Sequence, residues 1–243
     1  ANYLLAAKVA IHSMMKHASR QYWYELYVFH TTLSPKAQQS LRNSLKEFTH
    51  TELHFIDVTQ YNEKIKNFGT KAHYSKEIFY KLIATDVLPQ YDRIICSDVD
   101  VVFTGDFSPV FFMFPNEKFY YAGVGPVENS RMPYYRKDFS TTEMEILEHE
   151  IAAGFLLINL KELRNDHKQE EIINFYVNNY PRLRLPEQDC IILTCWPYIK
   201  YLPIDYSLPI SFYRLNMNQR DFYQGNTEFA GDKATALAKF NKG

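Results

Sequence analysis

Apolar residues recur along the chain at two different spacings. Short apolar runs typical of strands occur at residues 24–30, 54–58, 93–96, 119–125, 152–160 and 198–203. Segments with apolar residues at helical spacing, or with helix-start signals, occur at residues 2–18, 34–48, 75–87, 140–148, 161–164, 169–179 and 186–195. Strands that alternate with helices predict an α/β fold, with a mostly parallel central sheet flanked by helices.

Several helix boundaries carry local signals. Ser34 followed by Pro35 predicts an N-cap and a first helical position, and Ser140 with Glu143 predicts a capping box. Acidic residues follow Pro186, where they complement the positive end of a helix. Residues 59–74 are expected to form a loop with one helical turn, and 226–243 a polar helix or tail. No repeat or linker divides the chain, so one domain is expected.

The strand at Arg93–Cys96 leads directly into two aspartates, Asp98 and Asp100. Open α/β sheets place their ligands at the carboxyl ends of buried strands. Two carboxylates this close repel each other unless a positive charge lies between them. Oxygen ligands favour Mg²⁺ or Mn²⁺, and such ions are commonly also bound to a substrate phosphate. The pattern therefore predicts a divalent metal on a phosphorylated ligand.

The same aspartates allow two other interpretations. Aspartate is common in turns after strands, because its side chain bonds the nearby backbone. Phosphatases of the haloacid-dehalogenase type also carry Asp-x-Asp-x-Val after an apolar strand, which residues 98–102 match with Asp98 as nucleophile. In that class the motif follows the first strand and an acidic pair comes later. Here at least two strands precede it and no Asp-Asp pair follows.

The composition narrows the class of protein. The chain has 243 residues, 46% of them hydrophobic and 16% aromatic, which suits a globular enzyme and excludes a disordered chain. The net charge of −1 gives no reason to expect a nucleic-acid or anionic-membrane partner, and no apolar run is long enough to span a membrane. Cys96, Cys190 and Cys195 match no zinc or redox spacing, so reduced thiols are expected. The expected location is the cytoplasm, either free or peripheral to the inner membrane face.

Four stretches together resemble glycosyltransferase family 8, whose retaining enzymes include glycogenin and bacterial lipooligosaccharide galactosyltransferases. They are Asn2-Tyr3 with the helix after it, the run into Asp-x-Asp at 80–103, AAGFLLINLKELR at 152–164, and LPEQDCI at 185–191. Their order agrees with the family across roughly residues 2–206. The resemblance implies a single nucleotide-sugar transferase domain of the GT-A type over residues 1–243.

The resemblance also implies a function and a set of site residues. It implies metal-dependent transfer of glucose or galactose from a UDP-hexose to a saccharide or glycan acceptor, as in cell-surface polysaccharide synthesis. Mn²⁺, or Mg²⁺ in its place, would be held by Asp98 and Asp100. Gln188 and Asp189 match catalytic positions beside the anomeric carbon. The positions that match donor-binding residues are Asn2, Tyr3, Lys81, Asp98, Val99, Asp100, Ala153, Gly154 and Glu187.

Simpler roles remain open for these residues. Lys81 can be a solvated helix lysine, and Asn2-Tyr3 a frayed end. Glu187 and Asp189 can complement a helix N-terminus without touching substrate. His73 and the cluster Tyr134, Tyr135 and Arg136 lie in loops where they can be solvated or can contact an acceptor.

The chain departs from the family pattern at several places. The family's C-terminal histidine ligand, in a His-x-x-Gly-x-x-Lys-Pro-Trp segment, has no counterpart, since His167 is the last histidine. Ala152 replaces an asparagine and Glu187 an aspartate. The first strand and the C-terminal metal-ligand segment are therefore expected to be missing from these residues. A non-catalytic, sugar-binding relative is the further alternative.

Overall fold

The structure is a computed structural model that describes residues 3–66, 76–125 and 137–207. Its strands are β1 Tyr24–His30, β2 Thr51–Asp57, β3 Arg93–Ser97, β4 Tyr121–Val124, β5 Phe155–Asn159 and β6 Ile199–Leu202. Its α-helices are α1 Leu4–His17, α2 Pro35–Asn43, α3 Ala84–Val87, α5 Thr141–Leu147, α6 Leu160–Asn165, α7 Lys168–Asn179 and α8 Pro186–Cys195. Shorter 3₁₀ segments are η1 Thr59–Ile65, η2 Lys76–Ile83, η3 Ser108–Phe112 and η5 Ile204–Tyr206.

The predicted helix starts are confirmed. The Ser34 hydroxyl accepts from the Ala37 N–H ahead of α2, and both bonds of the Ser140–Glu143 capping box are present at α5. Helix α2 ends at Asn43 instead of near Phe48, because the chain after it forms turns with i to i+3 hydrogen bonds. The expectations for His73, for the cluster Tyr134, Tyr135 and Arg136, and for residues 226–243 lie outside the described residues.

The predicted α/β fold class is confirmed, with a correction to strand direction. β1 and β2 pair in parallel, and the other sheet has the order β3-β5-β4-β6 with β4 and β6 parallel. β5 runs antiparallel to both β3 and β4, so the central sheet is mixed instead of mostly parallel. The chain leaves β4 and returns at the same end, where the Ala152 N–H donates to the Val124 carbonyl at 2.8 Å, so β5 runs back along β4.

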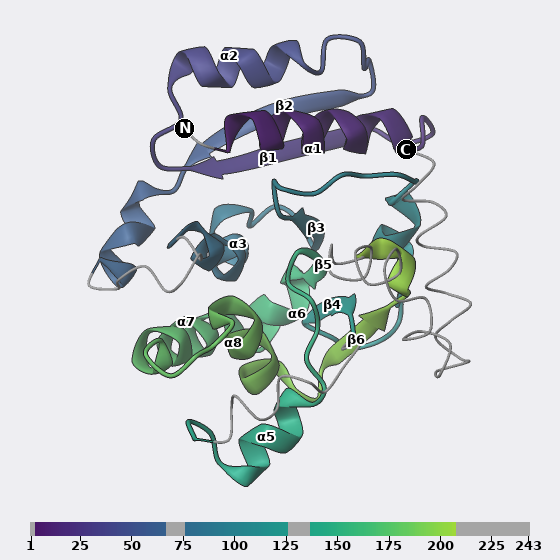
Figure 1. Cartoon of the computed structure of the whole chain (residues 1–243). Coiled ribbons are helices and arrows are strands. Elements are labelled where there is room, and N and C mark those ends of the chain that lie inside the picture. The colour runs from purple at the N-terminus through teal and green to yellow at the C-terminus, as the bar shows by residue number, and fades with distance from the viewer. Residues whose placement is uncertain (1–2, 67–75, 126–136, 208–243) are drawn as a thin grey trace, which may run out of the picture.

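The strands separate two hydrophobic cores. Leu156 and Ile158 of β5 pack into one core, while Phe155 and Leu157 pack into the other, as the alternation of side chains along a strand requires. Figure 1 shows α1 and α2 beside the β1–β2 pair, with α7 and α8 on the other side of the molecule. All five residues of β5 are buried, which makes it the centre of the fold.

The middle of the segment before the aspartates is buried on every side. Residues 75–87 were predicted as one amphipathic helix, but Lys76–Ile83 is a 3₁₀ segment followed by a single α-turn, α3. The five consecutive residues from Phe79 to Ile83 are all buried, because η2 contacts both α7 and α8. A helical segment enclosed in this way has no solvent face, so Lys81 must point into the protein.

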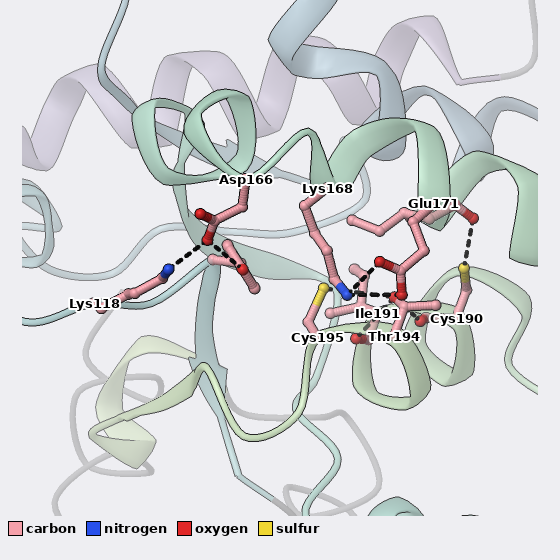
Figure 2. A network of polar contacts seen from close by, with 10 residues as sticks. Lys118, Asp166, Lys168, Glu171, Cys190, Ile191, Thr194 and Cys195 are labelled. Carbon is pink, nitrogen blue, oxygen red and sulfur yellow. Dashed lines mark hydrogen bonds and ion pairs between the residues drawn. The ribbon is translucent and has the colours of Figure 1, made fainter.

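Polar contacts join the end of α6 to the residues before β4, and α8 to α7 (Figure 2). The Asp166 carboxylate lies 2.5 Å from the Lys118 ammonium and accepts from the Tyr120 hydroxyl at 2.6 Å. The Cys190 thiol donates to the Ile172 carbonyl at 3.3 Å and thereby joins α8 to α7. Burial and the bond to Asp166 raise the pKa of Tyr120, so its hydroxyl remains a donor. Helix α8 is therefore joined to α7 behind its first turn.

The three cysteines form no disulfide. Cys96, Cys190 and Cys195 are all free, with Cys96 only partly covered and the other two buried. Within residues 3–66, 76–125 and 137–207, no helix combines the length and the apolar character that crossing a membrane requires.

Candidate active site

Lys81 joins two carboxylates that come from distant parts of the chain. Its ammonium lies 2.7 Å from Asp98 Oδ1, at the end of β3, and 3.3 Å from Glu187 Oε1, in the first turn of α8. Lys81 is 8% exposed, so the alternative of a solvated helix lysine is wrong. Its burial alone would lower the pKa of Lys81, but the Glu187 and Asp98 carboxylates outweigh it and raise that pKa. The ammonium is therefore charged at neutral pH.

Asp98 and Asp100 differ in exposure. The Asp98 N–H donates to the Gly154 carbonyl at 2.9 Å, which anchors the end of β3 beside the lead-in to β5. Burial raises the pKa of Asp98, the Lys81 ammonium lowers it, and repulsion from Asp100 adds to the rise. Asp100 is exposed, and Val99 between them is 39% exposed. The two carboxylates thus repel each other at the protein surface, as the sequence predicted.

Asp98 and Asp100 are too few to enclose a metal ion by themselves. The part of the chain that the structure describes holds no cluster of three or more His, Cys, Asp or Glu side chains suited to a metal ion. Asp98 Oδ1 already binds the Lys81 ammonium. Mg²⁺ and similar hard ions commonly take one or two protein carboxylates and complete their shell with water and substrate phosphates. The residues present therefore fit a metal that binds together with a phosphorylated ligand.

Gly154 leaves room for the Asp98 carboxylate. A Cβ at position 154 would lie 3.3 Å from Asp98 Oδ2, so Gly154→Ala would displace that carboxylate by a few tenths of an ångström. We expect kcat/KM to fall roughly 3- to 10-fold, because reactions depend steeply on the positions of reacting groups. The melting temperature should stay unchanged. Gly105→Ala is the matched control, since no atom lies within 4 Å of a Cβ there. Equal activity of the two variants would contradict this role of Gly154.

Gln188 projects from the first turn of α8 toward the segment before β5. Its Oε1 accepts from the Ala153 N–H at 3.3 Å, and its Nε2 donates to Glu150 Oε2 at 2.9 Å. Ala153 thus bonds to Gln188, while its neighbour Gly154 bonds to Asp98, so these two residues connect Gln188 with Asp98. Glu150 was not predicted from the sequence. The only signal was an acidic residue directly before an apolar segment.

Asp189 is fully buried and bonds to the backbone. Its Oδ2 accepts from the N–H groups of Arg184 at 2.6 Å and Leu185 at 3.0 Å, immediately before α8. This is the structural role that the sequence left open for acidic residues at this helix start. Glu187 is 7% exposed, and within the described residues its Oε2 is buried without a hydrogen-bond partner. A buried unpaired carboxylate oxygen is costly unless a ligand donates to it.

The N-terminal residues fall only partly within the structure. Tyr3 is 54% exposed and precedes α1 without a side-chain cap, and Asn2 lies outside the described residues. The structure therefore brings together Lys81, Asp98, Glu187, Gln188, Ala153 and Gly154, and leaves Tyr3 at the surface.

Comparison with known families identifies the protein. The sequence profile of "Glycosyl transferase family 8" matches residues 1–230. The chain belongs to glycosyltransferase family 8. As a family 8 member it is a glycosyltransferase, and this membership does not favour the phosphatase alternative. No curated protein matches the chain significantly.

Solved structures share the family 8 fold. The bifunctional glycosyltransferase WbbM matches with a TM-score of 0.75 and 18% identity, over 98% of this chain and 43% of its own length. The galactosyltransferase LgtC, in complex with donor and acceptor sugar analogs, matches with a TM-score of 0.72 and 18% identity, over 92% of this chain and 78% of its own. Mouse xyloside xylosyltransferase 1 matches with a TM-score of 0.64 and 17% identity, over 92% and 88%.

The chain spans less than half of the length of WbbM. At these identities the similarity shows a shared GT-A-type fold. The chemistry of this chain must therefore be argued from its own residues.

Proposed function

We propose that the protein is a metal-dependent retaining glycosyltransferase that moves glucose or galactose from a UDP-hexose to a saccharide or glycan acceptor. The observation that carries the proposal is the convergence of Lys81, Asp98 and Glu187 from three separate elements, with one Glu187 oxygen that is buried and has no partner among the described residues. A buried acceptor of this kind suits a hydroxyl-rich ligand such as a sugar. Buried, strongly interacting titratable groups are also typical of functional sites.

Asp98 and Asp100 would hold Mn²⁺, or Mg²⁺, on the diphosphate of the donor. When bound, the metal supplies Lewis-acid stabilisation of the negative charge that develops on the leaving UDP. Lys81 supplies a permanent positive charge to the same region and orients the Asp98 carboxylate through its 2.7 Å contact. Val99, Ala153 and Gly154 would line the donor site through their backbone.

Gln188 would lie beside the anomeric carbon, with its amide oxygen facing the positive charge that develops on the sugar. Glu187 would accept a hydrogen bond from a sugar hydroxyl. Asp189 is proposed to act through these two residues, because it fixes the turn into α8 by its bonds to backbone N–H groups. Asn2 and Tyr3 are proposed to contact the uracil or the ribose.

The proposal extends to one domain over residues 1–243, of which the structure describes residues 3–66, 76–125 and 137–207. Within those residues β1 pairs only with β2, and β3 pairs only with β5. Both strands nevertheless contribute side chains to the same two cores. A strand between β1 and β3 would join the two sheets into one.

Calorimetric titration of UDP tests the proposal. We expect binding in the presence of Mn²⁺ and its loss in EDTA, because two repelling carboxylates do not attract a diphosphate without a cation. Turnover of UDP-glucose and UDP-galactose then identifies the donor. Binding that is indifferent to EDTA would refute the metal role, and hydrolysis of phosphate monoesters in place of UDP-sugars would support the phosphatase alternative.

A further inference from the structure

Glu150 determines which way the Gln188 amide points. Glu150 is 6% exposed, and its Oε2 lies 2.9 Å from Gln188 Nε2. On the other side the Ala153 N–H lies 3.3 Å from Gln188 Oε1. A backbone N–H only donates and a carboxylate accepts, so these two partners place the amide oxygen at Ala153 and the amide nitrogen at Glu150. The orientation follows from the chemistry of the partners.

We propose that Glu150 is a positioning residue for the transfer reaction, acting through Gln188. The inference rests on the proposed function for its effect on turnover, but its structural part does not depend on that function. With one lone pair of Oε1 directed at Ala153, the second remains for the donor sugar. The amide therefore offers the sugar an oxygen, whose partial negative charge stabilises a developing positive charge.

Without Glu150 the side-chain amide of Gln188 can flip, so that its oxygen and its nitrogen exchange positions. The nitrogen would then face the donor, and its N–H groups would oppose the charge that develops on the sugar. The bond from Gln188 to a carboxylate is also stronger than a bond to a neutral acceptor, which restricts rotation further.

The segment that carries Glu150 is held firmly on both sides. The rings of His149 and Trp196 stack with centroids 3.9 Å apart and planes 8° apart. The Tyr201 hydroxyl donates to the His149 carbonyl at 3.3 Å. After Glu150, the Ala152 N–H is bonded to Val124 of β4, and a Cβ on Gly123 would lie only 3.0 Å from the Ala152 carbonyl oxygen. Contacts with β4, β6 and the end of α8 thus immobilise Glu150 relative to Gln188.

The functional test is a double-mutant cycle with Glu150→Ala and Gln188→Ala. UDP release from UDP-glucose and UDP-galactose is measured with Mn²⁺. We expect Glu150→Ala to lower kcat about 10- to 100-fold, as loss of the residues that orient a reacting group commonly does. The UDP Kd should stay within about twofold, because Glu150 does not contact the metal region. The double variant should lose no more than Gln188→Ala alone, since Glu150 acts through Gln188. Additive losses would overturn the proposal.

Matched variants separate this role from general damage. Glu148→Ala removes an exposed carboxylate two residues away and should leave kcat unchanged. Glu150→Gln keeps an acceptor for Gln188 and should recover part of the activity lost in Glu150→Ala. If Glu150→Ala does not fold, the cycle is run with Glu150→Gln instead, and a loss that adds to that of Gln188→Ala again overturns the proposal.

The positioning itself is measured by NMR without any turnover. The side-chain amide resonance of Gln188 is assigned by its disappearance in Gln188→Ala. We expect that resonance to shift and to exchange faster in Glu150→Ala, and to be unchanged in Glu148→Ala. An unchanged resonance would overturn the inference even in an active enzyme. If the wild type neither binds UDP nor turns over UDP-sugars while the resonance responds, the proposed function fails and the structural role of Glu150 stands.

Discussion

Replacing Lys81 with methionine is expected to lower the free energy of unfolding by about 3–5 kcal/mol and to abolish sugar transfer. Removing one partner of a buried ion pair leaves an uncompensated charge, which is the costly case. Here Lys81→Met would leave Glu187 buried and Asp98 at the same place with no cation between them. Urea unfolding followed by circular dichroism measures the first effect, and UDP release with Mn²⁺ measures the second.

Two further variants show whether the unpaired charge is the cause. Lys161→Met removes an exposed lysine of α6 and should change stability by less than about 0.5 kcal/mol. Adding Glu187→Gln to Lys81→Met removes the buried negative charge, so stability should recover in part while activity stays lost. A Lys81→Met protein as stable as the wild type would mean that the ion pairs of Lys81 with Asp98 and Glu187 contribute nothing to folding.

Asp100→Asn is expected to abolish Mn²⁺-dependent UDP binding and to lower kcat/KM by about 100-fold or more. A metal supplies several kcal/mol to the stabilisation of transition-state charge, and the amide is a poor substitute for a carboxylate ligand. The fold should be retained, because Asp100 is exposed and no buried contact depends on it within the described residues. Calorimetry with UDP and Mn²⁺, followed by turnover of UDP-sugars, measures both effects.

Asp86→Asn provides the control for Asp100→Asn. It removes an exposed carboxylate of α3 and should leave both UDP affinity and turnover at wild-type values. Relief of like-charge repulsion predicts that Asp100→Asn melts at the wild-type temperature or slightly above it. Unchanged turnover in Asp100→Asn would exclude a metal role for this residue.

The candidate site was only partly predictable, because its members meet through tertiary contacts. Asp98 and Asp100 were found because a buried strand followed by carboxylates is a local pattern. Glu187 and Gln188 entered through the resemblance to a family motif. Glu150 carries only the weak signal of an acidic residue before an apolar segment, because its effect depends on a partner 38 residues away. Asp189 was expected beside the reacting carbon, but its carboxylate bonds to the backbone before α8.

The sequence by itself determined the local elements. Pro186 followed by acidic residues placed α8 at Pro186–Cys195, and the hydroxyl and carboxylate of Ser140 and Glu143 determined the start of α5. These features depend on residues a few positions apart, so the chain encodes them locally.

Only the tertiary structure decided the direction of β5 and the surroundings of Lys81. The direction of a strand depends on which end of its neighbour the chain returns to, and here the Ala152–Val124 bond holds the return at the end where β4 finishes. Lys81 reads in sequence as one lysine on an amphipathic helix. It becomes a buried cation because α7 and α8 cover the segment and bring Glu187 within 3.3 Å. Burial depends on which elements pack together, and no local pattern contains that information.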